Sequence, residues 1–124
     1  MNKILILGFH AINLIMIIFY LYPGSIFGYF LYNDSSFQPQ ITRDFLISSN
    51  HFYVFIILST FGIWAYKNTK KITFLFLYLF LLSIILELFH LIIPNREFEL
   101  SDLFGNIIGI IFIMIIYKVK DKHV

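Results

Sequence analysis

The chain has 124 residues, of which 60% are hydrophobic and 13% are charged, and its mean hydropathy is +0.86. A water-soluble domain of this size needs a charged surface that this composition does not supply, so the lipid bilayer is the expected solvent. The absence of cysteine excludes disulfides and thiolate sites, and a net charge of +2 without a basic stripe argues against nucleic-acid binding.

Four apolar runs predict four membrane-spanning helices, at residues 4–22, 49–66, 72–93 and 101–117. A hydrocarbon core requires about 20 helical residues, which the second and fourth runs reach only with flanking interfacial turns. The first run follows a lysine, as in a signal peptide, but lacks a small-residue cleavage pattern and is interpreted as an uncleaved span. We therefore expect an all-α membrane protein, with one four-helix transmembrane domain over residues 1–124.

The connection between the first two spans is long and rich in turn-forming residues. It contains Pro23, Gly24, Asn33, Asp34 and Pro39, and is predicted to be irregular.

The basic residues predict the orientation of the bundle. Seven lysines fall on one side of the four spans: Lys3, Lys67, Lys70, Lys71, Lys118, Lys120 and Lys122. Only Arg43 and Arg96 fall on the other side. By the positive-inside rule, both termini and the 67–71 turn face the cytoplasm, which indicates a multi-pass protein of the cytoplasmic membrane.

Polar residues concentrate where the predicted spans meet the outer side. Glu87 lies seven residues before Pro94, which places it about 10 Å inside the outer end of its helix at about 1.5 Å per residue. A carboxylate at that depth is costly unless it is paired, protonated or hydrated, and His90 shares its helix face. The predicted functional cluster comprises His51, Glu87, His90, Arg96, Asp102 and Asn106.

Each of these features also has a purely structural interpretation. Gly105 and Gly109 form a G-x-x-x-G spacing on the same stripe as Asp102 and Asn106, which is typical of close helix packing. Asp102 is also suited to the N-terminus of a helix, and Arg96 to an interfacial anchor. Three further positions have a structural interpretation. His10 and Asn13 are expected to be interhelical hydrogen-bonding groups, and Tyr20 is expected to be one of the interfacial tyrosines.

The spacing E-x6-P-x-R-x5-D-x3-N-x2-G resembles the signature of the VanZ-like membrane protein family. It is formed by Glu87, Pro94, Arg96, Asp102, Asn106 and Gly109. His51-Phe52 resembles the family's other conserved element, so the resemblance covers the last three spans. The chain departs from the family at His90, where Gln is usual. A second departure is Ile47-Ser48-Ser49, where an Asp-Lys pair is usual.

The resemblance implies an envelope protein associated with low-level resistance to the glycopeptide teicoplanin, without an established enzymatic activity. Its expected partners are membrane lipids and either lipid-linked cell-wall intermediates or glycopeptides. Arg96 is the group most suited to an anionic partner, because a guanidinium can pair two oxygens at once. Glu87 and Asp102 are expected to hold Arg96 or His51 in place, and Arg96→Ala is expected to abolish a drug-susceptibility phenotype.

Two other functions stay open. The first is an intramembrane enzyme acting on a lipid phosphate or isoprenoid carrier, with His51 or His90 as base or nucleophile and Arg96 binding the anion. The second is a structural subunit that depends on Gly105 and Gly109 for helix packing.

Glu87 and His90 also form a Glu-x-x-His, a spacing used by di-metal bundles. Such sites draw on two of these motifs and on further glutamates, whereas this chain has one motif. The alternative is a zinc site in which His51 and Asp102 complete the ligand set with Glu87 and His90. We expect instead no metal or cofactor, with Glu87 and His90 acting as hydrogen-bonding partners for the cluster around Arg96.

Overall fold

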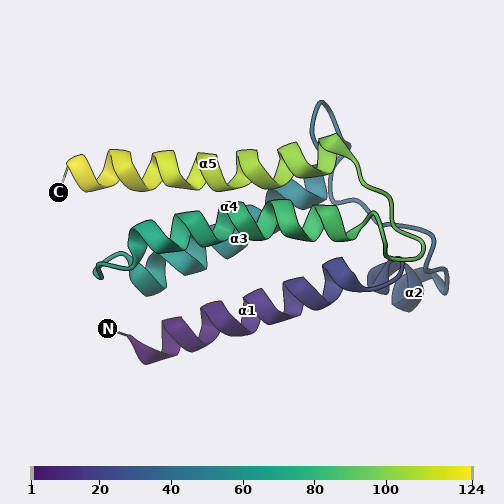
Figure 1. Cartoon of the computed structure of the whole chain (residues 1–124), viewed down its shortest axis with the longest axis horizontal. Helices are drawn as coiled ribbons and strands as arrows, with labels where there is room; N and C mark the ends of the chain where they lie inside the picture. The colour runs from purple at the N-terminus through teal and green to yellow at the C-terminus, as the bar shows by residue number, and fades with distance from the viewer. Residues whose placement is uncertain (1, 124) are drawn as a thin grey trace.

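A computed structural model describes residues 2–123, which form helices and connecting segments without strands. The helices are α1 (Lys3–Leu21), α2 (Ile26–Tyr32), α3 (Ser49–Tyr66), α4 (Ile72–Phe89) and α5 (Leu100–Lys122). The four long helices run in alternating directions (Figure 1). Both chain ends and the α3–α4 turn lie at one end of the bundle, here called the lysine end. Helix α2 and the long loop lie at the other, here called the α2 end (Figure 1).

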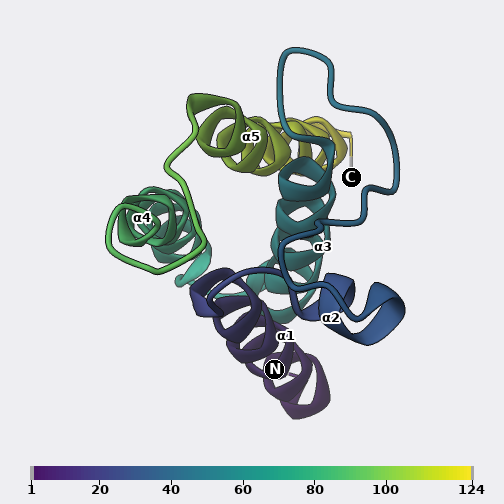
Figure 2. The ribbon, with the colours of Figure 1, turned by 90° about the vertical axis from the view of Figure 1, so that its right-hand side faces the viewer.

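Three helices, α1, α4 and α5, are long and apolar enough to cross a membrane, which supports a membrane protein. Helix α3 has 18 residues but is not one of these three, and it begins with the polar residues Ser49, Asn50 and His51. It packs against α1, α4 and α5, and Figure 2 shows it between α1 and α5. The polar side chains of α3 can therefore face other helices, where polar groups are tolerated better than in contact with lipid.

Large apolar side chains cover the outside of the bundle, whereas the centre is closely packed. Phe55, Leu58 and Ile110 are fully buried, while Phe74 is 71% exposed and Leu7 is also 71% exposed. Such side chains are costly to expose to water over so wide a surface, but they suit contact with lipid chains. The inside and outside of the bundle are thus both apolar, as expected of a membrane protein.

Two helix ends differ from those predicted from sequence. Helix α4 ends at Phe89, not at residue 93. The amides of residues 90–92 donate to carbonyls three residues back instead of four, and Pro94, which lacks an amide hydrogen, cannot continue the helix. Glu87 therefore lies in the last turn of α4, closer to the helix end than predicted. Helix α5 continues to Lys122 instead of 117, with Lys120 and Lys122 in its last turn, where cations favour the helix dipole.

The long loop is not irregular throughout, because it contains the short helix α2. The Ser25 hydroxyl accepts a hydrogen bond from the Gly28 amide at 2.9 Å, which caps the start of α2. Asn33 ends the helix in a left-handed conformation with φ of 52°. Further along, the Asp44 carboxylate accepts from the Ser49 amide at 2.9 Å and so anchors the loop to the start of α3.

Helices α3 and α5 approach each other closely at two glycines. A Cβ atom at Gly105 would lie 2.7 Å from the Ser48 carbonyl oxygen, and one at Gly109 would lie 2.8 Å from the Phe52 carbonyl oxygen. The Ser48 amide also donates to the Ser101 carbonyl at 3.0 Å. This contact brings the polar face of α5 directly against the start of α3.

Candidate functional site

A group of buried and partly buried polar side chains lies at the α2 end, where the ends of α1 and α4 meet the starts of α3 and α5. We call it the polar cluster, and it consists of Tyr20, His51, Glu87, His90, Asp102 and Asn106. The alternating helix directions place these residues together although they are up to 86 residues apart in sequence. Five of the six residues predicted from sequence are in this group, and Arg96 lies beside it.

Tyr20, His51 and Asn106 form a triangle of short polar contacts. The Tyr20 hydroxyl donates to the Asn106 Oδ1 atom at 2.8 Å, and His51 Nδ1 lies 2.9 Å from the hydroxyl and 3.0 Å from Oδ1. The hydroxyl has a single proton, so both Oδ1 contacts are hydrogen bonds only when His51 Nδ1 also carries one. The triangle therefore favours a protonated Nδ1, which leaves Nε2 as the free nitrogen of neutral His51.

Glu87 is fully buried and is held through one of its two carboxylate oxygens. Its Oε1 atom accepts from the Glu99 amide at 3.2 Å and lies 3.3 Å from His90 Nδ1. His90 Nε2 donates to the Tyr20 carbonyl at 3.0 Å, and the His90 ring stacks on the Tyr20 ring. The second oxygen, Oε2, has no hydrogen-bond partner and lies 4.0 Å from His51 Nδ1.

The cluster is least buried at His51 and Asp102. Their side chains are 15% and 18% exposed, and His51 Nε2 lies 3.5 Å from the Asp102 Oδ2 atom. An imidazole and a carboxylate at this separation can share a proton, exchange one through a water molecule, or hold a cation between them. His51 and Asp102 are therefore the members of the cluster that a ligand can reach.

Arg96 does not pair with Glu87 or Asp102, contrary to one of the arrangements expected from sequence. Its Nε atom donates to the Tyr22 carbonyl at 3.1 Å and its Nη2 atom donates to the Phe19 carbonyl at 2.7 Å. These carbonyls belong to the end of α1, where a cation also favours the helix dipole. Partial burial lowers the pKa of the Arg96 guanidinium from its ordinary value, but the group stays charged. The carboxylates are beside His51 instead.

Arg96→Ala is expected to lower the free energy of unfolding by about 2 kcal/mol, because it removes two charge-assisted hydrogen bonds from the end of α1. Arg96→Lys keeps the charge but not the planar fork, and should recover less than the full loss. Unfolding of the purified protein in detergent measures both variants. Wild-type stability of Arg96→Ala would contradict the anchoring role.

Tyr20 is the member of the cluster that sequence reasoning missed. It was interpreted as an interfacial tyrosine, but it is buried, with 7% exposure, and contacts His51 and Asn106. Its position three residues before Pro23, at the same end of the bundle as His51, is the sequence signal that points to this role. The predicted interhelical hydrogen bonds of His10 and Asn13 are confirmed, since their partners are Tyr66 and Tyr78.

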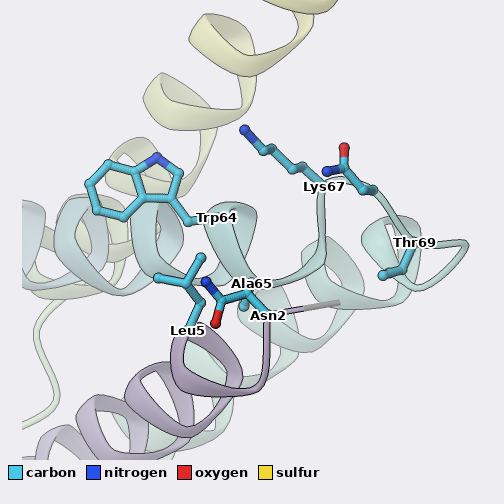
Figure 3. Close-up of a pocket in the computed structure, with 7 residues that line it drawn as sticks. Asn2, Leu5, Trp64, Ala65, Lys67 and Thr69 are labelled. Atoms are coloured by element: carbon cyan, nitrogen blue, oxygen red, sulfur yellow. The ribbon is translucent and has the colours of Figure 1, made fainter.

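Two hollows in the described part of the chain lie away from the polar cluster. The first, of about 220 Å³, is at the lysine end between α1 and the end of α3, and Figure 3 shows Trp64 and Lys67 at its edge. The second is formed by residues 37–43 of the long loop. The cluster itself is a packed arrangement of polar side chains with one partly exposed side.

No protein-family model, curated protein or solved structure matches this chain. Function is inferred from the geometry of the polar cluster and from the spacing of its residues.

Proposed function

We propose that this chain is a VanZ-like protein of the cytoplasmic membrane that affects how glycopeptides or their lipid-linked cell-wall targets are engaged at the cell envelope. The observation that carries the proposal is the meeting of Glu87, Asp102 and Asn106 with His51 at one end of the bundle. These residues belong to the spacing that resembles the VanZ-like signature, and their polar side chains are grouped in an otherwise apolar molecule.

In this proposal α3 crosses the membrane together with α1, α4 and α5. Its 18 residues suffice for a span when its polar start lies at the interface, and its burial among the other helices compensates for its lower hydropathy. The seven lysines lie at the end of the bundle that carries both termini, so the positive-inside rule directs that end to the cytoplasm. The polar cluster then faces the outer side, where glycopeptides and their targets meet the membrane.

Within the cluster, His51 and Asp102 are the groups that would contact a ligand, because they are its partly exposed members. Glu87 and Asn106 would keep them in position from the buried side. Arg96, which sequence reasoning favoured as the anion-binding group, has two of its donors engaged by the end of α1. The chemistry available to a ligand is therefore that of an imidazole and a carboxylate side by side.

Expression of the chain in a teicoplanin-susceptible bacterial host is expected to reduce susceptibility, and Asp102→Asn is expected to abolish the effect. The asparagine keeps the size of the side chain but removes the charge beside His51, so a lost effect on susceptibility would be due to the missing charge and not to a change of shape. The minimal inhibitory concentration of teicoplanin measures the effect, and an immunoblot of the membrane fraction verifies equal abundance.

His10→Gln is the matched control, because His10 lies in the half of the bundle away from the polar cluster and forms a hydrogen bond with the Tyr66 hydroxyl. It should leave the teicoplanin effect intact. Two outcomes would contradict the proposal. One is unchanged susceptibility on expression of the wild-type chain, and the other is a full effect from Asp102→Asn at equal abundance.

A further inference from the structure

The polar cluster contains three groups in an arrangement suited to a metal ion. His51, Glu87 and Asp102 each offer one ligand atom, and these atoms all lie within 4.8 Å of one another. They come from three different helices, α3, α4 and α5, so their grouping is a product of the tertiary fold. Around a tetrahedral Zn²⁺ with bonds of about 2.0–2.2 Å, ligand atoms are roughly 3.3 Å apart, so binding would draw the three ligand atoms closer by up to about 1.5 Å.

The carboxylates of the cluster form no ion pair with a lysine or an arginine among residues 2–123. Glu87 and Asp102 are two carboxylates, and among residues 2–123 their ion-pair partners within 4.0 Å are histidines only. Arg96 is directed to the carbonyls of α1. Two adjacent carboxylates at the end of an apolar bundle need cations or protons, and a divalent cation neutralises both at once.

An unpartnered buried oxygen points to the same place. Glu87 is fully buried, and its Oε2 atom has no hydrogen-bond partner although its Oε1 atom is held by the Glu99 amide. Buried carboxylate oxygens rarely lack a partner, so we expect a bound group or ion at Oε2. Because Oε1 is fixed, Oε2 is held on the side of His51, 4.0 Å from its Nδ1 atom.

The surroundings of His51 match those of a metal-binding histidine. A ligating imidazole usually donates its other ring N–H to an oxygen acceptor, which fixes the ring and its tautomer. The triangle with Tyr20 and Asn106 favours a proton on Nδ1, and the lone pair of Nε2 is then directed at the Asp102 side. A lone pair facing a carboxylate oxygen at 3.5 Å is repulsive unless a proton or a cation lies between them, and a metal ion there would take both groups as ligands.

We propose that His51, Glu87 and Asp102 form a binding site for a divalent transition-metal ion, with Zn²⁺ the best match to one imidazole and two carboxylates. Three protein ligands leave one position open, on the exposed side of His51 and Asp102. This departs from the expectation of no metal, and the Glu-x-x-His contributes only Glu87 as a ligand. His90 positions Glu87 from outside the ligand set, since its Nε2 atom is bonded to the Tyr20 carbonyl.

The site uses the same cluster as the proposed function, but it does not depend on the teicoplanin effect. Full-length protein purified in detergent and stripped with a chelator is titrated with Zn²⁺ against a chromophoric chelator. We expect one Zn²⁺ per chain. His51→Gln and Asp102→Asn should each weaken binding at least about 100-fold, beyond the 10–100-fold typical of groups outside the ligand set.

Two further variants sharpen the assignment. His90→Gln should keep one Zn²⁺ per chain with about 10-fold weaker binding, because it changes only a positioning residue. His10→Gln, at the other half of the bundle, should bind as wild type. Circular dichroism verifies that every variant is folded, and a Zn²⁺ affinity of His51→Gln and Asp102→Asn equal to wild type would overturn the site.

Wild-type protein alone gives an independent test if the ligand variants fail to fold. In the electron paramagnetic resonance spectrum of the Cu²⁺-loaded protein, we expect nitrogen coupling from one imidazole. Coupling from two imidazoles, or from none, would overturn the ligand set, as would an affinity for Mg²⁺ equal to that for Zn²⁺. Absence of Zn²⁺ binding together with an intact teicoplanin effect would refute the metal site and leave the proposed function standing.

Discussion

Gly109→Leu is expected to prevent assembly of the helix bundle, and Gly109→Ala to lower its free energy of unfolding by about 1–3 kcal/mol. A Cβ atom at this position would lie 2.8 Å from the Phe52 carbonyl oxygen and 3.2 Å from the Phe55 Cβ atom. Both are close to the backbone of α3, so neither can move without shifting the helix. Four carbons of a leucine side chain have no space at this contact.

The effect should extend to the polar cluster, because α3 and α5 carry His51, Asp102 and Asn106. Separating the two helices by even a fraction of an ångström lengthens the contact of His51 with Asn106. Unfolding of the purified protein in detergent, followed by circular dichroism, measures the change in stability.

Gly8→Ala is the matched control, since a Cβ atom at Gly8 meets nothing within 4 Å. Gly8 lies within α1, where alanine is favoured over glycine by about 0.5–1 kcal/mol, so this variant should be slightly stabilised. The two glycine-to-alanine changes therefore have opposite expected signs. A Gly109→Ala protein as stable as Gly8→Ala would show that the close contact of α3 and α5 does not limit the bundle.

The parts of the fold that could be predicted are those encoded by local periodicity and charge. Apolar runs identify the four long helices, and lysines at alternate ends of successive runs predict that the helices alternate in direction. A period of 3.6 residues places Asp102, Gly105, Asn106 and Gly109 on one face of α5. Glu87, His90 and His51 then follow as neighbours, because they lie at the same end of antiparallel helices.

The parts that could not be predicted depend on helix rotation and on contacts between distant residues. Tyrosine suits both a membrane interface and a buried polar contact, and only the rotation of α1 decides that Tyr20 is buried. Arg96 contacts carbonyls that lie 74 and 77 residues earlier in the chain, and no local pattern encodes such a pairing. Helix α2, with seven residues, is too short to produce a clear periodic signal.

Glu87→Leu is expected to lower the free energy of unfolding by about 2–3 kcal/mol, because it leaves the Glu99 amide without an acceptor and removes the polar contact with His90. The Glu99 amide lies 3.2 Å from Oε1, and His90 Nδ1 lies 3.3 Å from it. Glu87→Gln keeps a carbonyl oxygen that can accept from the amide, so it should cost about 1 kcal/mol. Denaturation in detergent without added metal measures this difference.

Added Zn²⁺ should show that the two carboxylate oxygens of Glu87 have different roles, Oε1 in stability and Oε2 in binding the ion. Wild-type protein at a free Zn²⁺ concentration 100 times its dissociation constant gains about 2.7 kcal/mol of stability through mass action. Glu87→Gln should gain far less at the same concentration, because an amide group is a poor ligand in place of Oε2. Glu87→Gln would thus be close to wild type without metal and clearly weaker with it, whereas Glu87→Leu would be weaker in both conditions. Equal stabilisation of wild type and Glu87→Gln by Zn²⁺ would show that Oε2 does not bind the ion.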